Sequence, residues 1–147
     1  MIRSQIQRSE RHVTPVPRAP LAWGVVVGGI TAATPLAFWW LPAATVYSMG
    51  LVLIAAVYIG FAVADGRRHV IVETAVAAAF VVVAAIATTG SAWLVVAGLV
   101  GHGVKDLWQH RTGFVAGTRW WPPFCVMVDW VAALLIAAVI SSGVPLL

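Results

Sequence analysis

Four side chains capable of acid/base chemistry stand inside long apolar stretches of this sequence. His102 and Asp106 lie near the end of one apolar run, and Glu73 and Asp129 lie within two others. An ionisable group costs about 2.5–3.5 kcal/mol at the centre of a membrane helix, so such groups usually face the bundle interior and a partner. A buried carboxylic acid opposite a histidine can donate and recover a proton. We therefore predict these acid/base or ligand groups: Glu73, His102, Asp106 and Asp129.

Helical spacing gathers further polar and aromatic residues around these four. His102, Asp106 and His110 recur every four residues, so they share one stripe of a helix. Tyr58 and Asp65 share a face of another apolar run. We expect a polar pocket open to the cytoplasmic interface, with nearby tryptophans that either hold a cation or flat ligand or form an aromatic belt. The predicted ligand-binding residues are Tyr58, Asp65, Trp108, His110 and Trp130.

The elements that must position these residues are membrane helices. Hydrophobic residues make up 61% of the 147 residues and charged residues 10%, whereas soluble proteins have about 45–50% and about 25%. Five apolar runs are each close to the ~20 residues needed to cross a hydrocarbon core of ~30 Å. We predict an all-α integral membrane bundle of five transmembrane helices over residues 21–147, with a kink at Pro35. The expected spans are 21–41, 44–64, 70–88, 92–108 and 122–144.

The basic residues indicate which way the bundle faces. If residues 1–20 form a disordered cytoplasmic tail, all nine Lys and Arg residues fall in that tail, in the turn at 65–69 or in the segment 105–121. The connections on the other side carry none, as the positive-inside rule requires. We expect a multi-pass protein of the bacterial cytoplasmic (inner) membrane, with its N-terminus in the cytoplasm and its C-terminus outside. Because the basic residues form no continuous patch, we expect no nucleic-acid binding.

Metal binding is one chemistry that this pattern leaves open. His102 and Asp106 are spaced to bind one zinc or non-haem iron ion with help from Glu73 or Asp129. However, His102 and His110 are ~12 Å apart along a helix axis, and the sequence holds no HExxH motif. The lone cysteine, Cys125, can form neither a disulfide within this chain nor a cysteine-based metal cluster. We therefore predict no cofactor, with a divalent metal at His102 and Asp106 as a minor alternative.

Acid/base chemistry on a lipid is the leading functional hypothesis. A buried acid opposite a histidine, with tryptophans to stabilise positive charge, suits a membrane isomerase or cyclase acting on an isoprenoid. We predict that the protein binds or chemically modifies a lipid-like molecule in the inner-leaflet pocket, and whether it is an enzyme stays open.

The alternative hypothesis is a non-catalytic structural or accessory subunit. The alanine-rich stretch VETAVAAAFVVVAAIA suits docking on a larger membrane complex or on a second copy of the chain. The buried polar residues would then serve only to join helices. In either case, three glycines would let neighbouring helices approach the polar stripe closely, namely Gly98, Gly101 and Gly103.

Two stretches resemble small bacterial multi-pass membrane proteins of unknown function. The first, GHxxxDxxxHR, runs from Gly101 to Arg111, and the second, WWPPFCxxxD, runs from Trp120 to Asp129. The resemblance covers about residues 58–135. It implies a multi-pass helical architecture and carries over no activity, cofactor or partner.

Overall fold

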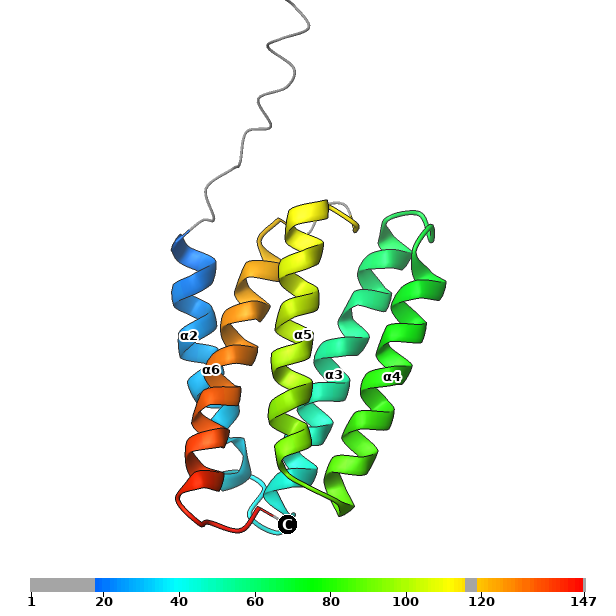
Figure 1. Ribbon diagram of the computed structural model, residues 1–147. Coiled ribbons are helices and arrows are strands. Elements are labelled where there is room, and N and C mark those ends of the chain that lie inside the picture. The colour runs from blue at the N-terminus through cyan, green and yellow to red at the C-terminus, as the bar shows by residue number, and fades with distance from the viewer. Residues whose placement is uncertain (1–17, 116–118, 147) are drawn as a thin grey trace, which may run out of the picture.

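The computed structural model describes residues 18–115 and 119–146, and within these ranges the chain is 81% helical with no strand. Five long helices run side by side with alternating direction (Figure 1). This confirms the all-α class and the count of five helices. The elements are α2 (Arg18–Ala33), the short 3₁₀ helix η1 (Thr34–Leu36), α3 (Ala43–Ala64), α4 (Val70–Thr89), α5 (Trp93–Thr112) and α6 (Trp121–Ser141).

Pro35 ends the first helix, where the sequence analysis expected a kink. Its ring nitrogen has no hydrogen to donate to the carbonyl of Thr31, one helical turn earlier. The Thr34 hydroxyl donates to that carbonyl instead, at 2.7 Å, and the chain tightens into η1. α2 also begins earlier than predicted, so residues 18–20 are helical and do not belong to the tail. The rest of the predicted tail, residues 1–17, lies outside the described residues.

α5 continues beyond its predicted end at residue 108 and reaches Thr112. Gly113 follows with a φ of 61°, a left-handed conformation that glycine adopts at little cost, and its N–H donates to the Gln109 carbonyl at 2.8 Å. The extra turn adds Gln109 to the buried face of the helix. The predicted spans of α3, α4 and α6 agree closely with the structure.

The order of packing differs from the order along the chain. α2 packs along α6, α6 along α5 and α3 along α4, while the consecutive helices α2 and α3 make few contacts. Two glycines bring α2 onto α6. A Cβ atom on Gly24 would lie 2.5 Å from the Cβ of Met127, and one on Gly28 would lie 2.8 Å from the carbonyl oxygen of Val128. Small residues at such positions let membrane helices approach closely.

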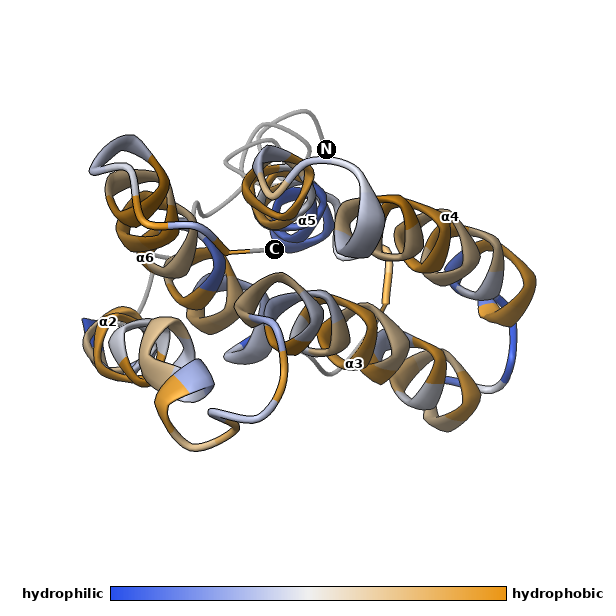
Figure 2. Cartoon of the chain, turned by 90° about the horizontal axis from the view of Figure 1, so that it is seen from below, coloured by the Kyte–Doolittle hydropathy of each residue, from blue (hydrophilic) through white to orange (hydrophobic). Residues whose placement is uncertain are grey.

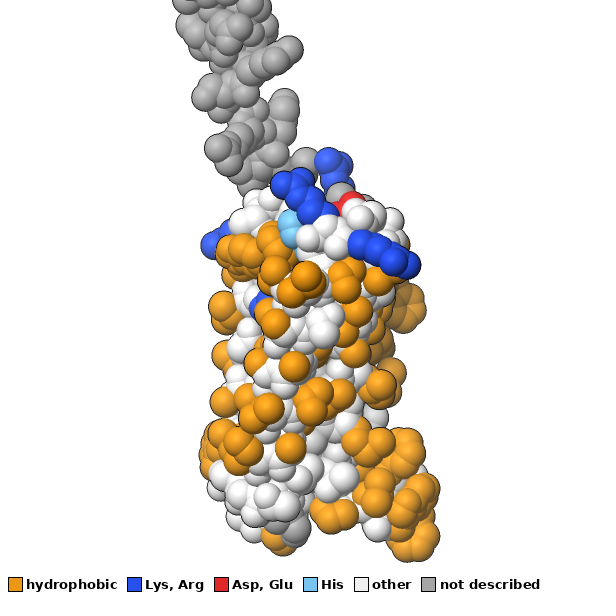
Figure 3. Space-filling view, turned by 90° about the vertical axis from the view of Figure 1, so that its right-hand side faces the viewer, with side chains coloured by type: hydrophobic (Ala, Val, Ile, Leu, Met, Phe, Trp, Pro, Cys, Tyr) orange, Lys and Arg blue, Asp and Glu red, His pale blue; other side chains and the backbone are white. Residues whose placement is uncertain are grey.

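Several ionisable side chains are buried while many large apolar side chains are exposed, which is unusual for a soluble protein. Ile71 and Leu36 are more than four-fifths exposed, whereas Glu73 and Asp129 are buried. Figure 3 shows hydrophobic side chains over the flank of the bundle, with Lys and Arg gathered at one end. Large exposed apolar surfaces mark contact with a membrane or a partner. Within residues 18–115 and 119–146, four segments are long and apolar enough to cross a membrane: Arg18–Leu36, Ala43–Ala64, Val70–Thr89 and Trp121–Ser141.

α5 is long enough but less apolar than these four segments, because its C-terminal half is rich in polar residues (Figure 2). These polar residues point inward. His102 and Asp106 have no exposed surface, while the outward residues Val100, Val104 and Trp108 recur every four positions and are apolar. The helix therefore presents an apolar stripe to its surroundings and a polar stripe to its neighbours in the bundle.

Candidate functional site

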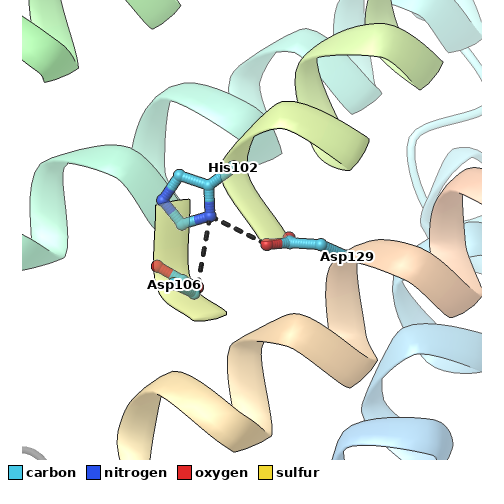
Figure 4. Close-up of side chains that lie close together, drawn as sticks. All are labelled: His102, Asp106 and Asp129. Atoms are coloured by element: carbon cyan, nitrogen blue, oxygen red, sulfur yellow. Dashed lines mark hydrogen bonds and ion pairs between the residues drawn. The ribbon is translucent and has the colours of Figure 1, made fainter. Parts of the chain in front are cut away.

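His102, Asp106 and Asp129 meet at the interface between α5 and α6 (Figure 4). The Nδ1 atom of His102 lies 2.8 Å from Oδ2 of Asp129 and 3.5 Å from Oδ2 of Asp106. All three side chains are fully buried. Sequence spacing predicted the pairing of His102 with Asp106, and the structure brings Asp129 to the same imidazole nitrogen.

Close approach of α5 and α6 places Asp129 opposite His102. A Cβ atom on Gly103 would lie 2.4 Å from Nε1 of Trp130, so only glycine leaves room for the indole there. That indole N–H donates to the Val100 carbonyl at 3.4 Å, a long hydrogen bond between the two helices. Gly98 similarly admits a leucine of α3, as expected, but Gly101 faces open space and plays no such part.

Several polar atoms of this cluster lack a hydrogen-bond partner among the described residues. They are both carboxylate oxygens of Asp106, Oδ1 of Asp129 and Nε2 of His102. Burying a polar group without a partner costs free energy, and most buried polar groups in folded proteins have one. We expected these residues to line a pocket open at the end of the bundle. Instead, the surrounding helices enclose them completely.

Glu73 belongs to a neighbouring network and not to the cluster around His102. Its Oε2 atom lies 3.0 Å from the ammonium of Lys105, and its Oε1 atom accepts a hydrogen bond from the Gln109 amide. The Lys105 ammonium also donates to the Gln109 side-chain oxygen at 3.1 Å and lies 3.6 Å from the centre of the Tyr58 ring. The buried Glu73 carboxylate is therefore neutralised by a partly buried ammonium.

Sequence reasoning missed Lys105 and Gln109 as site residues. Gln109 lies three residues after Asp106 on the same helix face, so the spacing that selected His102 and Asp106 would also have selected it. Lys105 was counted with the cytoplasmic segment 105–121 for the positive-inside rule, although it also falls within the predicted span 92–108. The structure places its ammonium beside Glu73 within the bundle.

Aromatic rings fix the orientation of the imidazole. The ring centre of His102 lies 5.2 Å from that of Phe80 in α4 and 6.0 Å from that of Tyr58 in α3. Tyr58 is fully buried, as expected of a residue at the site. Its hydroxyl interacts electrostatically with Asp106 without the geometry of a hydrogen bond.

The other predicted ligand-binding residues lie elsewhere. Asp65 caps the C-terminal end of α3, where its N–H donates to the Phe61 carbonyl at 2.9 Å. His110 is in the last turn of α5. Trp108 is half exposed on the outer stripe of α5, and Trp130 is 39% exposed at the edge of the α5–α6 interface. These two tryptophans therefore face the surroundings of the bundle.

An apolar cavity of about 690 Å³ lies between α2, α3 and α6. It exists because α2 pairs with α6 and leaves α3 apart, as the view along the bundle shows (Figure 2). Its wall on α6 includes Cys125 and Val128, which lie one turn and one residue before Asp129. The buried cluster and the cavity therefore share one helix as a wall. The other lining residues are mostly apolar and include Val27, Ile54, Val57, Leu99, Trp121 and Phe124.

Comparison with protein-family models, curated proteins and solved structures finds no match for this chain. The resemblance to small bacterial multi-pass proteins therefore rests on the two sequence stretches alone. The function must be argued from the site itself.

Proposed function

We propose that this protein spans a bacterial cytoplasmic membrane five times and binds or chemically modifies a lipid-like or isoprenoid molecule in the apolar cavity, beside a buried acid/base cluster. The observation that carries the proposal is the position of α6, which contributes Cys125 and Val128 to the cavity and Asp129 to the cluster.

The membrane orientation is supported by charge and exposure. The described arginines gather at one end of the bundle, at the start of α2, in the turn after α3, and at the connection between α5 and α6. Under the positive-inside rule this end faces the cytoplasm. α5 crosses with the other helices because its outward stripe is apolar and its ionisable residues are enclosed by neighbouring helices.

The cavity has the size and character of a site for an apolar chain. Pockets that bind small molecules measure about 300–1,000 Å³ and are mostly apolar with a few polar groups nearby. This cavity lies between helices whose outer faces would contact lipid, so a ligand enters it from the hydrocarbon phase. Long apolar chains partition into that phase, which favours a lipid or isoprenoid over a water-soluble ligand.

The cluster supplies groups suited to proton transfer. An imidazole between two carboxyl groups can give up and recover a proton, provided that a reacting group comes within hydrogen-bond distance. Cys125 lies one helical turn from Asp129 and lines the cavity, so it marks the point of α6 where a ligand would come nearest to the cluster. Tyr58 and Phe80 keep water away from the imidazole.

Filling the cavity tests the proposal. Gly50 lines the cavity, and a Cβ atom there would have nothing within 4 Å, so Gly50→Phe adds a ring to the cavity without a backbone clash. Gly60 on the same helix is equally unobstructed and lies outside the cavity, which makes Gly60→Phe the matched control. Native mass spectrometry and lipid extraction on protein kept in its own membrane patch would then measure bound amphiphile.

We expect the wild type and Gly60→Phe to carry a bound amphiphile and Gly50→Phe to lose it. Equal occupancy of the two variants would contradict a ligand in this cavity. A wild-type protein that carries no amphiphile and aggregates when purified alone would instead favour the structural or accessory subunit.

A further inference from the structure

We propose that His102, Asp106 and Asp129 together bind one divalent metal ion of the zinc class. Each residue offers a ligand atom, and these atoms lie within 4.8 Å of one another (Figure 4). Sequence spacing left a divalent metal at His102 and Asp106 only as a minor alternative, with Glu73 or Asp129 as the further carboxylate. The tertiary structure supplies Asp129 from α6 as the third ligand.

The balance of charge is the first argument. Glu73 already neutralises Lys105, at 3.0 Å. His102 therefore faces two carboxyl groups. When both are ionised, even a protonated imidazole leaves one negative charge unbalanced in a fully buried site. Isolated buried charge is costly and is normally paired or bound to a metal. A divalent cation with a neutral imidazole and two carboxylates gives a net charge of zero.

The unpartnered oxygens are the second argument. An imidazole N–H at Nδ1 can donate fully to one carboxylate, and Asp129 at 2.8 Å is that acceptor. Both oxygens of Asp106 and Oδ1 of Asp129 then have no hydrogen-bond donor among the residues described. A metal ion bound to Nδ1 could accept one oxygen from each carboxyl group at the same time. A single proton on Nδ1 cannot serve both carboxyl groups in this way.

The distances between the ligand atoms suit an ion the size of zinc. Zinc binds imidazole nitrogen and carboxylate oxygen at about 2.0–2.2 Å, so two ligands in a tetrahedral site lie about 3.3 Å apart. The distances from Nδ1 to the two Oδ2 atoms, 2.8 and 3.5 Å, fall on either side of this value. Side-chain adjustments of less than about 1 Å would complete the site.

The ligand set indicates the class of metal. One nitrogen and two carboxylate oxygens suit zinc, iron or manganese, whereas calcium takes six to eight oxygens and magnesium keeps several waters. Three protein ligands leave a coordination position open, as in catalytic zinc sites. This inference does not depend on the proposed lipid ligand.

The test measures metal content and spectra directly. Full-length protein is purified in lipid nanodiscs without chelating resin, its metals are counted by inductively coupled plasma mass spectrometry, and the stripped protein is titrated with Zn²⁺ and Co²⁺. We expect one ion per chain. With Co²⁺ we expect the visible bands of a tetrahedral site without a thiolate charge-transfer band, because Cys125 is not a ligand.

Variants distinguish a metal site from general packing. Asp129→Asn and Asp106→Asn should each weaken Zn²⁺ binding by about 100-fold or more. The double variant Glu73→Gln with Lys105→Met is the matched control, since it removes a nearby buried carboxylate together with its cation and should bind Zn²⁺ like the wild type. A wild type that neither contains metal nor binds Zn²⁺ or Co²⁺, or equal loss in the double variant and Asp129→Asn, would overturn the proposal.

The same preparations separate this inference from the proposed function. Bound amphiphile is measured beside bound metal, and Gly50→Phe should lose the amphiphile while retaining the ion. A wild type that carries metal but no amphiphile would therefore count against the lipid site only, and a wild type that carries amphiphile but no metal would count against the metal site only.

Discussion

At the scale of single residues, two buried networks differ in how their charges are balanced. Glu73 has an ammonium within 3.0 Å and an amide donor from Gln109. His102 instead faces two carboxylates. The charges of the first network balance, which fits a structural role. The second network has more carboxyl oxygens than hydrogen-bond donors, which fits a site for a cation or for proton transfer.

Removing Lys105 from its ion pair with Glu73 should destabilise the protein. Lys105→Met leaves Glu73 buried without a cation, and breaking a buried ion pair in this way costs about 3–5 kcal/mol. We expect the variant, held in detergent micelles, to unfold at a lower denaturant concentration than the wild type. The double variant Glu73→Gln with Lys105→Met should recover most of that loss, because replacing both charges is often nearly neutral.

At the scale of helices, the pairing of α2 with α6 shapes the cavity. Gly24 and Gly28 allow this pairing because side chains at these positions would collide with α6. α3 is then left free to pack on α4. The space between α2 and α3 becomes the apolar cavity. Two small residues on one helix therefore determine where a ligand would bind.

Enlarging one of these glycines should separate α2 from α6. In Gly24→Ala the new methyl group would meet the Phe124 carbonyl oxygen at 2.6 Å, and such overpacking costs about 1–3 kcal/mol. The unfolding midpoint should fall, and so should the amount of bound amphiphile. Gly29→Ala on the same helix has nothing within 4 Å of the new atom and should behave like the wild type. Equal stability of the two variants would contradict close packing at Gly24.

At the scale of the whole molecule, large apolar side chains are exposed while several ionisable side chains are buried. Leu36 and Trp39 are about four-fifths exposed, and Asp106 and Asp129 have no exposed surface. Water would reverse both preferences. A lipid bilayer would favour both the exposed apolar side chains and the buried carboxyl groups, provided that the arginine-rich end lies at one surface of the bilayer.

Accessibility labelling tests this orientation. Single cysteines are introduced in a Cys125→Ala background at Arg67, in the turn after α3, and at Ser91, in the turn before α5. A maleimide that cannot cross membranes should label Ser91→Cys in intact cells and should label Arg67→Cys only after the cells are broken. Labelling of Arg67→Cys from outside would contradict a cytoplasmic N-terminus.

The sequence by itself determined the helices and the residues capable of chemistry. Apolar runs of the right length predict five helices, because hydrophobicity and length are local properties. The spacing of His102 and Asp106 likewise needs only one helix. Pro35 was misjudged because whether a proline kinks or ends a helix depends on which group takes up the freed carbonyl, here the Thr34 hydroxyl.

Only the tertiary structure decided which helices are in contact, and therefore which side chains form the site. The contact of Asp129 with His102 depends on the register of α5 against α6, which is set by Gly103 and Trp130. The pairing of Glu73 with Lys105 and the cavity beside α6 depend in the same way on packing between distant segments. Periodicity along a chain shows which face of a helix is polar. It does not show which neighbour that face meets, because that choice rests on the shapes of two surfaces at once.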